Sequence, residues 1–193
     1  MILTKKQEEG LKIAIERYKN HEPWTCIAGY AGTGKTSLTG ALVRALREAN
    51  VPVVLLAPTG RAAKRMTETT GYEARTLHRL LELNGRVDGD ANFKAGFERN
   101  EDNPIEADVV IVDEMSMVDV RLLHSLLSAL PKDCRLILVG DSDQLPPVGP
   151  GFAFGDCLRS GVIPTVRLTE VFRQAQQSLI VRNAHKVNQG QMP

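Results

Sequence analysis

The sequence predicts an α/β fold, with a mostly parallel sheet that carries helices on both faces. Short apolar runs alternate with segments of helical periodicity, as in βαβ units joined by right-handed crossovers. Residues 52–57 form one such run, and a strand without polar alternation is typical of a parallel sheet covered on both sides. With 193 residues and an apolar content of 42%, the chain fits one domain with a substantial core.

The expected helices and strands alternate along most of the chain. Amphipathic periodicity predicts a first helix over residues 4–20, and Thr4 and Gln7 have the spacing of a capping box. Residues 84–104 are rich in Gly, Asn and Asp and predict an exposed loop or small insertion. Because there is no internal repeat or low-complexity linker, residues 1–193 are expected to form a single domain. The other strands are expected at 25–28, 108–112, 135–139 and 165–168, and the other helices at 35–49, after Gly60, at 75–83, at 120–130 and from about Ser178.

Residues 29–36 match the Walker A pattern G-x-x-x-x-G-K-[ST], between a predicted strand and a predicted helix. Glycines let consecutive backbone N–H groups turn inward around a polyphosphate, and the helix N-terminus attracts anions. Lys35 can reach the terminal phosphates, and the Thr36 hydroxyl can hold Mg²⁺. The residues expected to bind the triphosphate are Gly29, Gly32, Thr33, Gly34, Lys35 and Thr36.

An apolar strand that ends in Asp113-Glu114 has the form of a Walker B motif. Asp113 is expected to bind Mg²⁺, directly or through a water, and Glu114 to act as the general base that polarises an attacking water. The alternative is a pair of carboxylates that cap a helix and face solvent. The upstream Walker A loop favours the metal site, because both motifs then converge on one ion.

The segment Gly140–Pro147 follows another predicted strand and places Gln144 where its amide can sense the γ-phosphate. The prolines after it stiffen the loop, so that a small movement at the phosphate can be transmitted. An ordinary Pro-rich turn is the alternative. No Asn-Lys-x-Asp pattern follows a strand, so the sequence lacks the usual guanine-reading signal of GTPases.

The net charge and the cysteine spacing argue against a globally basic nucleic-acid-binding protein and against a cysteine-ligated metal site. The net charge of +1 gives no global basic field, so nucleic acid must be bound by local patches. Basic residues gather in residues 61–86, whereas residues 88–119 are acidic. The cysteines Cys26, Cys134 and Cys157 lack metal-ligand spacing and are expected to be buried, reduced thiols. With no membrane-spanning run, a soluble cytoplasmic protein without a membrane partner is expected.

Taken together, these motifs resemble the superfamily 1 DNA helicases, most closely the RecD type (the exodeoxyribonuclease V alpha-subunit group). The resemblance covers essentially the whole chain, with the motifs in the family's order. It implies a RecA-like P-loop NTPase fold, ATP and Mg²⁺ as cofactors, and single-stranded DNA as partner. It also implies that Gln7, in a segment similar to the Q motif, bonds the adenine, and that Arg173, in a segment similar to motif IV, approaches the γ-phosphate.

The resemblance also implies two elements that contact DNA. Residues 58–63 are similar to motif Ia, and residues 76–81 to the Thr-x-His element that lies along the strand. Hydroxyl and backbone N–H groups there suit phosphate oxygens, and the binding should be salt-sensitive and largely independent of sequence. The residues that carry over are Pro58, Thr59, Gly60, Arg61, Thr76 and His78.

The chain departs from the family after motif IV, because the second motor domain and its motifs V and VI have no counterpart. We therefore expect the first motor domain of a helicase, weakly active or inactive alone, which needs a second RecA-like domain or partner helicase or nuclease subunits. Residues 84–104 stand where the family inserts a strand-separating element, but are expected to be too short for a full wedge. The alternatives are a nucleotide-dependent interaction module and a P-loop kinase, although no lid rich in arginine is identifiable.

Overall fold

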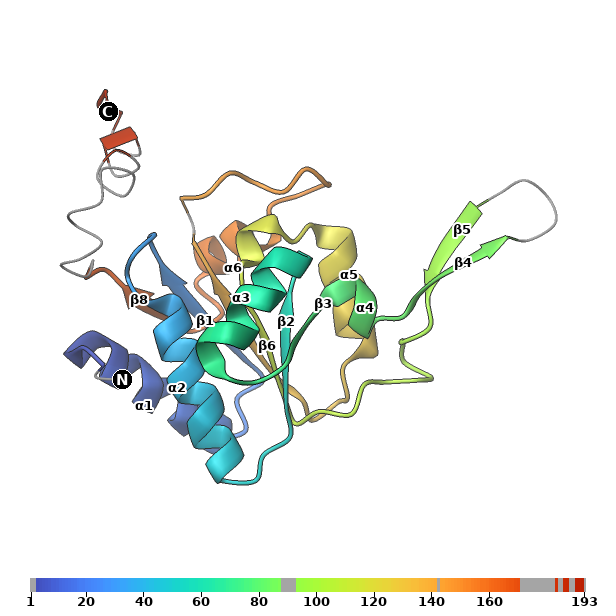
Figure 1. Ribbon diagram of the computed structural model, residues 1–193, viewed down its shortest axis with the longest axis horizontal. Helices are drawn as coiled ribbons and strands as arrows, with labels where there is room; N and C mark the ends of the chain where they lie inside the picture. The colour runs from blue at the N-terminus through green and yellow to red at the C-terminus, as the bar shows by residue number, and fades with distance from the viewer. Residues whose placement is uncertain are drawn as a thin grey trace.

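A six-stranded, all-parallel sheet forms the centre of the molecule in the computed structural model, with the strand order β3-β2-β6-β7-β1-β8 (Figure 1). The structure describes residues 3–87, 93–141, 143–170, 183, 186–187 and 190–192, and only the backbone of 83–87 and 93–96. The predicted parallel sheet is confirmed. Its strands are β1 (Trp24–Gly29), β2 (Val53–Ala57), β3 (Ala74–Thr76), β6 (Val109–Val112), β7 (Arg135–Gly140) and β8 (Thr165–Leu168).

Helices cover both faces of this sheet, as predicted. Successive strand residues point to opposite sides, and because both sets are apolar, each face packs against helices. In β1, Cys26 packs into the core beneath α5 and α6, with Leu126 and Phe154. Its neighbour Ile27 packs into the core beneath α1 and α2, with Leu38. The helices are α1 (Lys5–Lys19), α2 (Lys35–Glu48), α3 (Gly60–Thr70), α4 (Leu77–Leu80), α5 (Val120–Ala129) and α6 (Ala153–Ser160), with a 3₁₀ turn η1 (Met115–Met117).

The capping box predicted at the start of α1 is present. The Thr4 hydroxyl accepts a hydrogen bond from the Gln7 backbone N–H at 3.3 Å, and the Thr4 N–H donates to Gln7 Oε1 at 2.9 Å. These two bonds satisfy backbone donors that have no partner inside the helix. They fix the position of Gln7 at the start of the chain's first element.

Both boundaries of the helix expected over residues 75–83 were wrong, and helix α6 was not predicted. The helix expected over residues 75–83 is only the single turn α4, because residues 74–76 pair with β2 as strand β3. The Thr76 hydroxyl then accepts from the Arg79 N–H at 3.2 Å and starts the turn. Helix α6 follows a Pro- and Gly-rich stretch that hides its periodicity. The helix expected from about Ser178 lies almost wholly outside the described residues.

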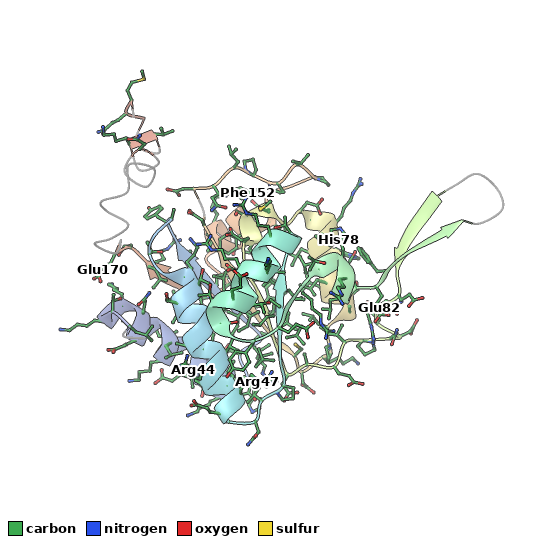
Figure 2. All side chains as sticks on the ribbon, viewed as in Figure 1. Arg44, Arg47, His78, Glu82, Phe152 and Glu170 are labelled. Atoms are coloured by element: carbon green, nitrogen blue, oxygen red, sulfur yellow. The ribbon has the colours of Figure 1, made fainter. Side chains whose placement is uncertain are left out.

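Residues 84–104, expected as an exposed loop or small insertion, include most of a two-stranded antiparallel ribbon, β4 (Leu83–Val87) and β5 (Phe93–Phe97). The ribbon projects from the sheet beside α4 and α5 (Figure 1). At its base, Arg99 forms a salt bridge with Glu82 at 2.8 Å, and the rings of His78 and Phe97 lie 6.1 Å apart. Figure 2 shows His78 and Glu82 on this side of the molecule. The insertion is therefore anchored to the domain by side chains.

The expectation of buried, reduced thiols holds for most of the cysteines. All three are free, and Cys26 and Cys134 are buried whereas Cys157 is half-buried. Burial raises the pKa of Cys26 to about 12 and that of Cys134 to about 11, which keeps both thiols protonated and unreactive. No helix in the described part of the chain is long and apolar enough to span a membrane.

Candidate nucleotide-binding site

The phosphate loop joins the carboxyl end of β1 to the start of α2 and depends on its glycines. Gly32 has a φ of +81° and Gly34 a φ of +78°, a left-handed conformation that costs a residue with a Cβ free energy. A Cβ on Gly29 would lie 2.5 Å from the Thr33 hydroxyl oxygen. That hydroxyl donates to the Tyr30 carbonyl at 2.8 Å, which closes the turn. The loop therefore has the tight bend that a Walker A sequence requires.

Lys35 lies across this loop and contacts a carboxylate that the sequence did not single out as a site residue. Its Nζ donates to the carbonyls of Gly29 at 2.6 Å and Tyr30 at 3.1 Å. It also lies 3.8 Å from Oδ2 of Asp141, a buried residue at the end of β7. The position of Asp141 directly after a buried strand was the available signal. Asp141 can hold the ammonium group at the mouth of the loop.

A cavity of about 520 Å³ brings the predicted Walker A and Walker B residues together. It also includes Arg65 and Thr69 of α3, which the sequence did not assign to the nucleotide. Gly29, Thr33 and Gln7 do not line it. Its lining residues are Tyr30, Ala31, Gly32, Gly34, Lys35, Thr36, Ser37, Arg65, Thr69, Asp113, Glu114 and Gln144.

The oxygen ligands in this cavity fit Mg²⁺. Thr36 supplies a hydroxyl and Asp113 a carboxylate, the hard donors that this ion prefers. Within the described residues, no group of three or more His, Cys, Asp or Glu side chains could hold a metal by itself. An ion at this position would therefore complete its coordination with phosphate oxygens and water.

The two Walker B carboxylates have different surroundings. Burial is the largest effect on Asp113 and raises the pKa of its carboxyl to about 6. The negative charge of Glu114 also raises this pKa, whereas the hydrogen bond from the Glu114 backbone N–H and the positive charges of Lys35 and Arg65 lower it. Glu114 is half-buried and has φ +55° and ψ +40°, a strained conformation for a residue with a side chain. Its N–H donates to Asp113 Oδ1 at 2.8 Å, which stabilises the bend. The bend presents both carboxylates to the cavity.

Gln144 connects this cavity to a second, larger one. The Ser116 hydroxyl, fully buried in η1, donates to Gln144 Oε1 at 2.8 Å. Gln144 also lines a neighbouring cavity of about 940 Å³, which includes the loop of residues 145–149 and the side chains of Met117 and Leu122. Nothing in the sequence pattern indicated a role for Ser116. Its hydrogen bond ties the turn after Glu114 to the predicted γ-phosphate sensor.

Three of the predicted DNA-contacting residues, Pro58, Thr59 and His78, line this second cavity. Gly60 and Arg61 are exposed at the start of α3, beside it. The hydroxyl of Thr59 accepts from the Ala62 N–H at 3.2 Å, and it keeps its own proton for an acceptor such as a phosphate oxygen. The structure thus places Pro58, Thr59 and His78 around a cavity that adjoins the one lined by Lys35 and Glu114.

Thr76 is half-buried and does not line the second cavity; its hydroxyl caps α4. Gln7 is also apart from the cavities, with an exposed fraction of 1%, and its side chain lies against the backbone of the phosphate loop. Arg173 lies outside the described residues. The adenine role of Gln7 and the γ-phosphate role of Arg173 stay predictions.

Comparisons with known proteins agree with this geometry. A family model described as an AAA domain matches residues 3–193. The ATP-dependent RecD2 DNA helicase of Deinococcus radiodurans is 40% identical over 86% of this chain and 22% of its own length. The RecBCD enzyme subunit RecD of Haemophilus influenzae is 34% identical over 69% of this chain and 24% of its own length.

A solved helicase structure is also similar to this chain in its fold. The Pif1 helicase from Candida albicans superposes with a TM-score of 0.69 at 27% identity, over 100% of this chain and 45% of that one. The chain thus spans less than half of the length of each of these relatives. With its parallel sheet, phosphate loop and paired carboxylates, the chain belongs to the AAA domain family and is a relative of the RecD-type superfamily 1 DNA helicases.

Proposed function

We propose that this chain is the first RecA-like motor domain of a RecD-type DNA helicase, which couples ATP hydrolysis to movement along single-stranded DNA. One observation carries the proposal: Gln144 lines both the cavity that holds Lys35, Asp113 and Glu114 and the cavity that holds Thr59. A side chain shared in this way can respond to a phosphate on one side and to DNA on the other.

The described side chains supply the parts needed for hydrolysis. Lys35 exchanges its loop carbonyls for phosphate oxygens when a triphosphate enters, and Asp141 keeps the ammonium near the loop. Thr36 and Asp113 would hold Mg²⁺, which would neutralise charge that develops on the phosphates. Glu114 accepts a proton from a water whose oxygen attacks the γ-phosphorus. The bond from that phosphorus to the β–γ bridging oxygen then breaks.

The neighbouring cavity suits a single strand. Thr59 donates to phosphate oxygens, while Arg61 adds positive charge that acts on any sequence. The apolar loop of residues 145–149 also lines this cavity. The named activity of the relatives, ATP-dependent DNA helicase, supports this assignment.

A second motor domain is part of this proposal. An arginine from a neighbouring domain is worth about 10³–10⁵ in rate of phosphoryl transfer. Translocation also needs two domains that close and open around each nucleotide. Alone, residues 1–193 should bind ATP and hydrolyse it slowly, and should not unwind duplex DNA. Extension with a second domain, in the same chain or from a partner subunit, should restore the activity.

The test measures ATP turnover by this chain with and without a single-stranded oligonucleotide. We expect turnover to rise with DNA, and to disappear in both Lys35→Ala and Glu114→Gln. The Gln variant should retain ATP binding, because it keeps the size of the side chain and removes only the base. If nucleotide affinity and turnover are the same with and without DNA, the coupling to DNA is wrong, and a nucleotide-dependent interaction module becomes the better assignment.

A further inference from the structure

Two side chains of α3 line the nucleotide cavity, although the Walker motifs gave them no role there. Arg65 and Thr69 lie four residues apart, so they share one face of the helix. The Thr69 hydroxyl donates to the Arg65 carbonyl at 2.8 Å, as is common for a threonine inside a helix. Of the α3 residues that line the cavity, Arg65 is therefore the one that brings charge to it.

The guanidinium of Arg65 faces the Walker B carboxylates without being bonded to them. Its positive charge lowers the pKa of Asp113, against the larger effect of burial, so the two groups lie within electrostatic range. The guanidinium forms no hydrogen bond or salt bridge with any residue that the structure describes. The adjacent Lys64, by contrast, lies 4.0 Å from Glu68. The donors of Arg65 are therefore available to a ligand in the cavity.

The charges that line the cavity leave room for a second cation beside the phosphates. Among the described residues, its lining has the carboxylates of Asp113 and Glu114 and the cationic side chains of Lys35 and Arg65. The Lys35 ammonium also lies 3.8 Å from Asp141, which offsets part of its charge. A complex of ATP with Mg²⁺ is still an anion, and an arginine can offer two parallel N–H donors to phosphate oxygens. Arg65 can thus supply the positive charge that Lys35 alone does not.

The backbone of α3 is fixed next to the phosphate loop. Met66, adjacent to Arg65, is 1% exposed and packs into the core beneath α1 and α2. The Thr67 hydroxyl donates to the Ala63 carbonyl at 3.0 Å and accepts from the Ala74 N–H at 2.9 Å, which ties α3 to β3. Figure 1 shows α3 beside α2, the helix that follows the phosphate loop. Tight packing of this kind leaves the helix little room to move, so the reach of Arg65 into the cavity is defined.

We propose that Arg65 is a phosphate-binding residue of the nucleotide site, and that its guanidinium contacts the terminal phosphate beside Glu114. This inference rests on the proposed function, because it requires a triphosphate in the cavity. In that function Glu114 and Gln144 adjoin the terminal phosphate, and both line the cavity together with Arg65. The nucleotide thereby gains a contact from α3, the helix that Thr59 caps beside the second cavity.

The experiment compares Arg65→Gln with Lys64→Gln in the full chain. Both changes remove one positive charge from an exposed position of α3, so both variants should fold, but only Arg65 lines the cavity. Dissociation constants for the Mg²⁺ complexes of ATP and ADP are measured by titration calorimetry. We expect Arg65→Gln to weaken ATP by about tenfold or more, the effect of one lost charge-assisted hydrogen bond, and ADP by less than about threefold. Lys64→Gln should change each by less than about twofold.

A third variant and a DNA-binding assay separate this role from others. Arg65→Lys keeps the charge but not the paired donors, so its affinity for ATP should lie between those of the wild type and Arg65→Gln. Equal ATP affinities in the two Gln variants, or equal weakening of ATP and ADP in Arg65→Gln, would overturn the inference and leave the proposed function intact. So would a loss confined to single-stranded DNA, which would make Arg65 a DNA contact. A wild-type chain that binds neither nucleotide would instead overturn the proposed function, and this inference with it.

Discussion

Replacement of Asp113 by Asn should make the ligand-free protein more stable at neutral pH. Burial raises the pKa of this carboxyl from its ordinary 3.8 to about 6, so the folded state binds the proton more tightly than the unfolded state. The stability that protonation confers is present at low pH and is lost as the pH rises from about 4 to about 6. The increase in the pKa of Asp113 corresponds to a loss of about 3 kcal/mol in the free energy of unfolding at neutral pH, because each pKa unit is worth about 1.36 kcal/mol.

The assay is urea unfolding of wild type and Asp113→Asn at a series of pH values in EDTA. Asparagine keeps the oxygen that accepts from the Glu114 N–H, so the bend should survive. The variant should match the wild type near pH 4 and exceed it by about 3 kcal/mol near pH 7. Asp108→Asn, at an exposed carboxylate just before β6, controls for the loss of one charge. A gap that is absent at pH 7, or equal at both pH values, would refute the reasoning.

Three further outcomes test other contacts. Ser116→Ala removes the donor to Gln144 and should reduce the stimulation of ATP turnover by single-stranded DNA, with ATP affinity within about twofold; unchanged stimulation would contradict it. Gly140→Ala should lower the free energy of unfolding by about 1–3 kcal/mol in urea titrations, because the new Cβ would lie 2.8 Å from the Phe154 ring. Arg61→Ala should weaken binding of all oligonucleotide sequences alike and flatten its salt dependence, which competition assays at several salt concentrations would show.

The sheet could be predicted because its signal is local. Strands β1, β6 and β7 are apolar runs whose ends are marked by Gly or Asp, so Asp113 and Gln144 could be placed at the same edge from their positions alone. The boundaries that failed depended on partners elsewhere in the chain. Residues 75 and 76 were expected to lie in a helix, yet the backbone of residues 74–76 pairs with β2. The ribbon of residues 83–97 depends on cross-strand pairs, and a segment rich in Gly and Asn has no sequence pattern that predicts them.

The contacts inside the site could not be predicted, for a related reason. The sequence places Lys35 in the phosphate loop, but its distance to Asp141 depends on how β7 lies against β1, a feature of register and packing. The same holds for Gln7, whose spacing to Thr4 predicts the cap but gives no information about the loop that lies 26 residues later. Motif residues thus identify the chemistry, whereas the positioning of those groups comes from neighbouring elements. Substitutions at residues to which the motifs assign no role, Asp141 and Ser116, should therefore alter the site as much as several of the predicted site residues do.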